Sequence, residues 1–340
     1  MVIYLVNHPV LIYNIHIASN ISCYGGIAMS VGANIKKRRF ELKMSQQELA
    51  EAMGYKTRST IAKIESGEND VTQKKLQRFA AILDTTVEAL VAGSTAVEED
   101  IALTQVEDSG HRSAVIILAG GKSGRNKQNI PNQFINIHDK PMIVYCLEAY
   151  QQHPAIDDIY IVCLKGWEDI VKAYARQYRI TKLRGLIPGG VSGIASLKNG
   201  VDCIKKRYTP EDTIIIQEAT RPLVNAETIS KLLQACAEKG SATVCHIMND
   251  YVQFNVSGAL PQYMDRNAIV ALQSPEAHRL SLLLDVFEKA KMQRHPLAES
   301  CCAMLMYNLG YPINFIEGGS NNIKIVREED LTVFSALVRK

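Results

Sequence analysis

The hydrophobic pattern divides the chain into two parts with different periods. From Met29 to about Ser94, apolar residues recur at three- and four-residue spacing, and Ser or Thr stands where several of these runs begin. This spacing predicts five short helices near 31–42, 46–53, 58–65, 72–83 and 87–91. We therefore expect a small all-α domain in this part.

From about residue 112 to the C-terminus, short β-rich runs alternate with helical stretches. The strand candidates are SAVIILAG, IDDIYIVCL, TIIIQEA, SATVCHIM and INFIEG. Helices are predicted between them, including 141–152, 167–177, 194–206, 226–238 and 279–290. This alternation predicts an α/β domain with a largely parallel sheet that is covered by helices on both faces.

The segments outside these two parts have unusual charge patterns. Residues 96–109 carry five acidic side chains and no basic one, so we interpret 96–110 as a solvated linker between domains at 29–95 and 111–340. Residues 1–28 contain no charged side chain and lack the positively charged start of a secretory signal. We expect 1–28 to be a mis-called extension, with Met29 as the physiological start.

The composition narrows the class of protein. Of the 340 residues, 47% are hydrophobic and 21% are charged, which favours a folded core over a disordered chain. No uncharged apolar run reaches the roughly 20 residues that cross a bilayer, so no membrane span is predicted. The eight cysteines form no CxxC pair and the histidines lack metal-ligand spacing, so we predict neither a disulfide framework nor a zinc site. Free thiols and a cytoplasmic location are expected.

The all-α part resembles a known DNA-binding family. The stretch MSQQELAEAMGYKTRSTIAKIESGENDVTQKKLQRFAAIL places SQQELAEAMG and STIAKIESG as two successive helices, and Ser45 with Glu48 predicts a capping box. Over residues 31–91 the chain resembles the lambda-repressor/Cro-like helix-turn-helix family. One departure is an extra residue in GYKTR, between the two motif helices.

The resemblance implies DNA binding by the second motif helix in the major groove. Base-edge contacts are then expected from Arg58, Ser59 and Lys63, and Gln46 is placed to meet a phosphate. The basic run at 36–39 can attract phosphates, although an isolated KKRR is usually an ordinary solvated face. Residues 29–95 hold 11 basic and 8 acidic side chains, so this module carries +3.

The α/β part contains a glycine-rich loop, LAGGKSGRNKQNIPNQF, directly after its first predicted strand. It is neither a Walker loop nor a dinucleotide fingerprint. Together with PGGVSGIAS, EATRPLV, DRNAIVALQSPEA and EGGSNNIKIVREEDL, it resembles the cytidylyltransferases that act on methylerythritol phosphate and their ribitol-phosphate relatives. That family implies a Rossmann-like nucleotidyltransferase domain with a β-arm that makes a homodimer. It transfers CMP from CTP to a sugar-alcohol phosphate, with Mg²⁺, and releases pyrophosphate.

The resemblance also implies site residues. Nucleotide-binding roles fall on Ala119, Gly120, Gly121, Arg125, Gly190, Ser196 and Ala219. Substrate-binding roles fall on Arg221, Arg266, Ser274 and Lys324, and the catalytic candidates are Arg125, Glu218 and Lys324. The reaction requires cations that neutralise developing phosphate charge, and a carboxylate for the metal, here Glu218. The alternative for Arg125, Arg221 and Lys324 is a surface cation or salt bridge.

Several positions depart from the family pattern. Asn132 stands where the family has a lysine that stabilises the transition state, and Glu218 stands where it has a metal-binding aspartate. Other departures are Gly193, Asp250, Tyr251, Ser274, Glu276, Ser300, Cys301 and Asn321. Lys122 or Lys127 can substitute for the missing lysine. Cys301 and Cys302 are interpreted as small core residues, and the histidines as structural or exposed.

Two functional hypotheses follow. The first is a transcriptional regulator whose nucleotidyltransferase-like domain dimerises and senses CTP or a sugar-alcohol phosphate. It is motivated by an intact DNA-reading helix in a chain that lacks several of the family's catalytic residues. The second is a working cytidylyltransferase that carries a DNA-binding module. Dimerisation fits both, since helix-turn-helix modules usually read two half-sites. The acidic linker is expected to let the two DNA-binding modules adjust to that spacing.

Overall fold

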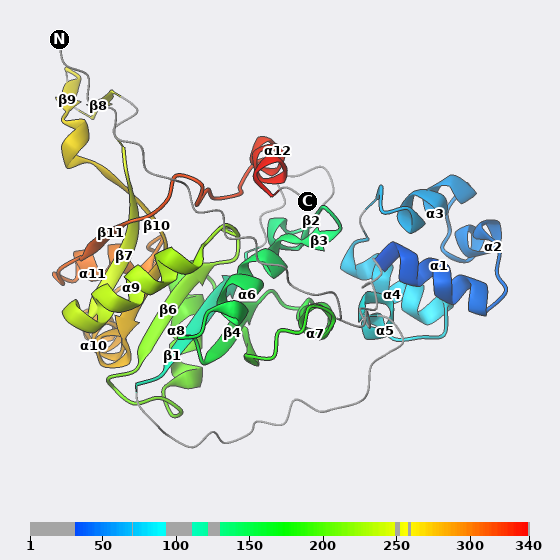
Figure 1. The fold of residues 1–340 in the computed structure, drawn as a ribbon, viewed down its shortest axis with the longest axis horizontal. Helices are drawn as coiled ribbons and strands as arrows, with labels where there is room; N and C mark the ends of the chain where they lie inside the picture. The colour runs from blue at the N-terminus through cyan, green and yellow to red at the C-terminus, as the bar shows by residue number, and fades with distance from the viewer. Residues whose placement is uncertain are drawn as a thin grey trace, which may run out of the picture.

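The computed structural model describes residues 31–69, 71–92, 111–121, 130–248, 252–257 and 260–338. We call residues 31–92 the head and residues 111–338 the body. Figure 1 shows the head beside the larger α/β body. The predicted extension at 1–28, the linker at 96–110, and Lys122, Arg125 and Lys127 lie outside the described residues.

Five helices form the head, close to the predicted positions: α1 (Val31–Glu41), α2 (Gln46–Ala52), α3 (Arg58–Glu65), α4 (Gln73–Ile82) and α5 (Val87–Ala92). The predicted capping box is confirmed, because Ser45 Oγ accepts from the Glu48 backbone N–H and Glu48 Oε2 accepts from that of Ser45. Buried apolar side chains from α1 to α4 fill the centre of the head. Gly32 lets α1 approach α3, since a Cβ there would lie 2.1 Å from Ile64 O.

A seven-stranded sheet with the order β11-β7-β10-β6-β1-β4-β5 forms the centre of the body. Its strands are β1 (Ser113–Ala119), β4 (Asp158–Cys163), β5 (Leu183–Pro188), β6 (Thr213–Glu218), β7 (Ser241–Ile247), β10 (Val270–Arg279) and β11 (Phe315–Glu317). All neighbours pair in parallel except β10, which runs antiparallel to β6 and β7. The predicted largely parallel sheet is therefore confirmed, with one reversed strand in its interior.

Helices cover both faces of the sheet, as predicted. Along β1, Val115 and Ile117 face one core and Ala114 and Ile116 face the other, because side chains alternate along a strand. The first core includes α6 (Met142–Gln152), α7 (Glu168–Gln177) and α9 (Ala226–Lys239). The second includes α8 (Gly193–Ile204), α10 (Leu280–Met292) and α11 (Cys302–Asn308). Helix α12 (Glu328–Leu337) follows near the C-terminus.

The remaining elements are short. A 3-10 turn at Asn132–Phe134 leads into the hairpin β2 (Asn136–Ile137) and β3 (Lys140–Pro141). The pair β8 (Gln253–Asn255) and β9 (Gln262–Met264), followed by a 3-10 turn at Arg266–Ala268, forms an arm that projects beyond β7 and β10 in Figure 1. No helix among the described residues combines the length and the apolar character needed to cross a bilayer.

The head packs directly on the body. One buried apolar cluster runs from the centre of the head into α6 and α7, and α5 contacts α7. The Gln73 side chain lies against Gly166, and Gly67 lies against Asp139 of the β2–β3 hairpin. The sequence predicted a linker that lets the head adjust its position. The structure differs from that expectation, because the head packs on α7 of the body.

Candidate functional site

A pocket of about 1100 Å³ opens at the carboxyl ends of the parallel strands. Loops that follow β1, β5 and β6 form its walls, together with part of β10 and the start of α11. This edge is where open α/β sheets bind ligands. The predicted residues Gly120, Gly121, Gly190 and Ser196 line the pocket, whereas Ala119 and Ala219 are buried beneath it.

Close backbone packing explains Gly190 in the second loop. A Cβ on Gly190 would lie 2.7 Å from the Ala195 carbonyl carbon, so only glycine fits there. The Gly190 N–H donates to Ser196 Oγ at 2.9 Å, and a Cβ on Gly120 would lie 3.6 Å from Gly189 Cα. The second loop is therefore fixed by its own contacts, and the first loop lies close to it at Gly120.

Gln133 supports the first loop and was not identified from the sequence. Its buried amide donates to the carbonyl oxygens of Ala119 at 2.8 Å and Gly121 at 3.0 Å. The loop is thereby tied to the 3-10 turn that precedes the β2–β3 hairpin. In the sequence, the glutamine of PNQF was the residue that could have indicated this support.

Helix α8 starts at the pocket. Ser192 caps it by accepting from the Ala195 N–H at 3.0 Å, and Ser192, Gly193 and Ile194 all line the pocket. The N–H groups and dipole at a helix N-terminus favour an anion. This end of the pocket is suited to a phosphate group.

Three predicted residues meet on the opposite wall. Glu218 accepts from Lys324 through Oε1 and from Arg221 Nε through Oε2, the latter at 3.1 Å. Arg221 also donates to the Asn322 carbonyl at 2.8 Å, which fixes the guanidinium. The structure therefore brings Glu218, Arg221 and Lys324 into one pocket, and a ligand phosphate there would meet two cations.

Ser274 supports this wall from β10. Its Oγ accepts from the Glu218 backbone N–H at 3.1 Å and from Gln217 Nε2 at 3.2 Å. Asn322 Nδ2 donates to the Ser274 carbonyl at 2.7 Å. The predicted substrate-binding Ser274 thus lines the pocket and also holds the strand end that carries Glu218.

Asn132 does not line the pocket. Its side chain is 2% exposed, and its amide donates to the carbonyls of Ile325 at 3.4 Å and Val326 at 3.0 Å. It therefore holds the segment that directly follows Lys324. Among the lining residues that the structure describes, Arg221 and Lys324 are the cations.

The two adjacent cysteines lie in the pocket wall. Cys302 is 1% exposed, which agrees with its interpretation as a core residue, yet both Cys301 and Cys302 line the pocket. Burial, helped by the Glu276 carboxylate, raises the pKa of Cys301 to about 11 and that of Cys302 well above its usual range. Both are therefore neutral thiols at neutral pH. The described cysteines are all free.

Arg266 lies on the exposed arm, outside the pocket. Within this one chain, the structure does not bring it together with Arg221 and Lys324. Its implied role toward a partner subunit's substrate stays a prediction.

The predicted DNA-reading residues lie on one helix of the head. Arg58, Ser59 and Lys63 are exposed on α3, so they are available to a groove. Gln46 donates to Glu65 at 2.9 Å. Including Arg39 among the phosphate-attracting residues is wrong, because its side chain is 4% exposed and pairs with Glu65 through bonds of 2.6 and 2.9 Å.

The doubly wound sheet and its glycine-walled, cation-bearing pocket define a nucleotidyltransferase-like domain. The family model for 2-C-methyl-D-erythritol 4-phosphate cytidylyltransferase matches residues 113–340, and a helix-turn-helix model matches residues 35–90. The chain belongs to the 2-C-methyl-D-erythritol 4-phosphate cytidylyltransferase family, with a helix-turn-helix region joined to its N-terminal side.

Similar proteins include the ribitol-5-phosphate cytidylyltransferase of Lacticaseibacillus paracasei. It is 31% identical over 227 residues, which cover 66% of this chain and 97% of that protein. The 2-C-methyl-D-erythritol 4-phosphate cytidylyltransferase of Clostridium botulinum (strain 657) is 28% identical over 230 residues, which cover 67% of this chain and 98% of that protein. The structure of the 4-diphosphocytidyl-2C-methyl-D-erythritol synthase of Anaerococcus prevotii has the same fold, with a TM-score of 0.57 and 20% identity over 68% of this chain and all of that one.

Proposed function

We propose that this protein is a DNA-binding transcriptional regulator whose cytidylyltransferase domain binds CTP and a sugar-alcohol phosphate. The observation that carries the proposal has two parts. Helix α3 is exposed, and Asn132, which stands at the family's lysine position, is buried and donates to a backbone carbonyl instead of lining the pocket. Losing one stabilising cation costs such a reaction about two to three decades in rate. Binding is expected to survive better than chemistry.

CTP binding is supported by the glycine loops and by the N-terminus of α8, where a triphosphate would meet backbone N–H groups. Mg²⁺ is usually held by one or two carboxylates together with substrate phosphates. Glu218 fits that requirement, because it lines the pocket and its side chain is 27% exposed between two cations. When bound, Mg²⁺ would neutralise triphosphate charge beside Glu218.

The acceptor phosphate would be held by Arg221 and Lys324, with Ser274 nearby. Ribitol 5-phosphate is the first acceptor to test, because two relatives at 31 and 30% identity are ribitol-5-phosphate cytidylyltransferases. Methylerythritol 4-phosphate is the second acceptor to test, because the family and the Clostridium relative are named for it.

A homodimer is part of the proposal. The arm exposes apolar side chains, with Phe254 54%, Tyr263 58% and Val256 74% exposed. Apolar patches of this kind often mark interaction sites, and the family implies that the arm is one. Light scattering of the full chain should give twice the chain mass, and Phe254→Asp should lower it.

The second candidate is an active cytidylyltransferase with a DNA-binding module. The meeting of Glu218, Arg221 and Lys324 in one pocket favours it. In this reaction an acceptor phosphate oxygen attacks the α-phosphorus of CTP, a new P–O bond forms, and pyrophosphate leaves. Arg221 and Lys324 would orient the acceptor phosphate and reduce its repulsion from the negatively charged triphosphate of CTP.

Pyrophosphate release from CTP, Mg²⁺ and either acceptor separates the two candidates. The regulator proposal predicts saturable CTP binding by calorimetry with release two to three decades below an active family member. Rapid release that Arg221→Ala abolishes, and that the exposed control Arg207→Ala leaves intact, would contradict it. Asn132→Lys tests whether the missing cation limits the rate, since restored release would locate the defect there.

A further inference from the structure

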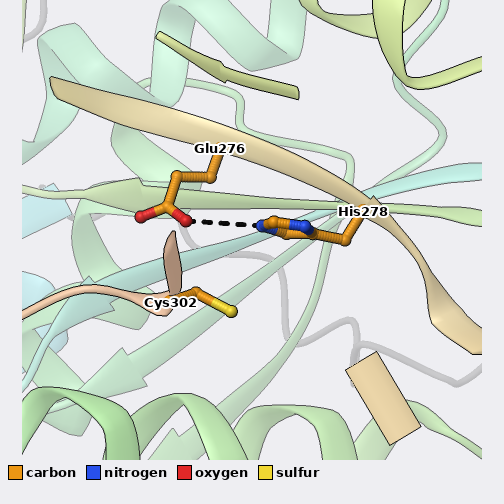
Figure 2. Close-up of side chains that lie close together, drawn as sticks. All are labelled: Glu276, His278 and Cys302. Carbon is orange, nitrogen blue, oxygen red and sulfur yellow. Dashed lines mark hydrogen bonds and ion pairs between the residues drawn. The ribbon is translucent and has the colours of Figure 1, made fainter. Parts of the chain in front are cut away.

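Three potential metal ligands meet beside the pocket, although they are dispersed in the sequence. Glu276 and His278 lie two residues apart on β10 and therefore share a face of the sheet, and Cys302 is the first residue of α11. Their exposed fractions are 3%, 1% and 1%, and their ligand atoms lie within 4.8 Å of one another. Figure 2 shows the carboxylate and the imidazole facing each other, with the Cys302 side chain below them.

Hydrogen bonds satisfy this cluster poorly. Glu276 Oε2 and His278 Nε2 are 3.4 Å apart, which is longer than an ordinary N–H···O bond. The other ring nitrogen, His278 Nδ1, is buried and has no hydrogen-bond partner. Glu276 Oε2 also accepts from the Ala303 N–H at 2.8 Å, which fixes the carboxylate.

A tetrahedral cation held by Glu276 Oε2 and His278 Nε2 fits the spacing of these two atoms. Ligand oxygen and nitrogen atoms bound to zinc at about 2.0–2.2 Å are about 3.4 Å apart, which is the spacing between Glu276 and His278. The ligand atoms lie within 4.8 Å of one another, so Cys302 Sγ would have to move by at most about 1.2 Å to complete this geometry. Metal binding displaces the proton of a coordinating thiol. The resulting Cys302 thiolate and the His278 imidazole favour Zn²⁺, Co²⁺ or Fe²⁺ over Mg²⁺.

We propose that Glu276, His278 and Cys302 form a binding site for a divalent cation of the Zn²⁺ type in the wall of the pocket. Glu276 and Cys302 also line the pocket, so the fourth position would face it. Three protein ligands with one open position are typical of zinc sites that bind water or a substrate oxygen. The oxygen would come from water or from a bound polyol phosphate, and the site is separate from the Mg²⁺ carboxylate proposed at Glu218.

Co²⁺ alone is the direct probe, added to the chelator-treated full-length protein. We expect one equivalent to bind, with the visible bands of tetrahedral Co²⁺ and a near-ultraviolet charge-transfer band from sulfur. Cys302→Ser should abolish the charge-transfer band, and His278→Asn should weaken Co²⁺ binding at least about tenfold. Cys301→Ser is the matched control, because it removes the adjacent thiol, and it should keep the band.

X-ray absorption of the wild-type protein loaded with Zn²⁺ tests the same site if a variant fails to fold. The expected result is one sulfur at about 2.3 Å and nitrogen or oxygen neighbours at about 2.0 Å. Absence of sulfur scattering, absence of a charge-transfer band in the wild type, or a band that persists in Cys302→Ser would each overturn the proposal. Glu276 and His278 would then be a buried hydrogen-bonded pair only.

Discussion

Four consecutive basic residues in the head occupy different environments. Lys36 and Lys37 are exposed, whereas Arg38 donates to the Leu83 and Asp84 carbonyls and Arg39 is buried against Glu65. The helical period alone separates them, because α1 turns Arg39 toward α3 and the lysines toward solvent. The phosphate attraction predicted for this run therefore rests mainly on its first half.

The Arg39–Glu65 pair gives a stability prediction. Its side chains are 4% and 3% exposed, so removing one partner leaves an uncompensated buried charge. Arg39→Met should lower the free energy of unfolding by about 3–5 kcal/mol. The double variant Arg39→Met/Glu65→Leu should lose less than Arg39→Met alone in urea unfolding. If the double variant loses as much as the sum of both single variants, the two charges act independently.

His153 gives a pH prediction. Burial lowers its pKa, and nearby Lys182 adds to this effect; its Nδ1 accepts from the Ala155 N–H. The unfolded chain therefore takes up a proton near pH 6.5 before the folded one does, so stability present above that pH is lost as the pH falls further. His153→Gln should flatten the fall in unfolding free energy below about pH 6.5. Equal slopes for both proteins would contradict this.

At the scale of elements, the reading helix α3 leads to a prediction about DNA. Arg58 is exposed at its N-terminal end, where helix-turn-helix proteins contact base edges. Arg58→Ala should weaken binding to a duplex selected from random sequence by about 1–3 kcal/mol and relax preference at one base. Arg207→Ala, on the exposed surface of the body, is the control in a fluorescence anisotropy titration. An unchanged base preference in Arg58→Ala would exclude this role.

Periodicity predicted most elements but missed two strands of the main sheet. Strand β5 has mixed burial, and β10 carries Gln273, Ser274, Glu276 and His278, which do not form an apolar run. β10 is strand-like because it pairs on both sides, which is a tertiary effect. The motifs located Glu218, Arg221 and Lys324, but Gln133, Asn322 and the Cys302 cluster depend on contacts between distant segments.

At the scale of the whole molecule, the shared apolar core predicts cooperative unfolding. Side chains of the head and of α6 and α7 belong to one buried cluster, so unfolding of either side exposes apolar surface of the other. Calorimetry of the full chain should show one transition that coincides with loss of circular dichroism. Two separated transitions, with the head melting first, would show that the contact through α5 and α7 is weak.

A physical route joins the helix-turn-helix head to the glycine-rich loop after β1. Gly67 lies beside Asp139 of the hairpin, and the hairpin follows directly on the turn at Asn132–Phe134. Gln133 in that turn donates to the carbonyls of Ala119 and Gly121. A nucleotide that moves the loop would therefore act on an element that the head touches. Any such coupling is reciprocal between DNA and nucleotide.

The most direct test of the regulator proposal is the affinity for a selected DNA duplex with and without saturating CTP and Mg²⁺. Fluorescence anisotropy of the full-length protein at fixed salt should show a shift in the dissociation constant of at least about fivefold, the lower end of typical allosteric coupling. In Gly190→Ala the added Cβ would clash with the Ala195 backbone and is expected to distort the proposed CTP site. This variant should lose the CTP-dependent change in DNA affinity while its DNA affinity without CTP stays the same. An identical dissociation constant with and without CTP, in a protein shown to bind CTP, would contradict the proposal.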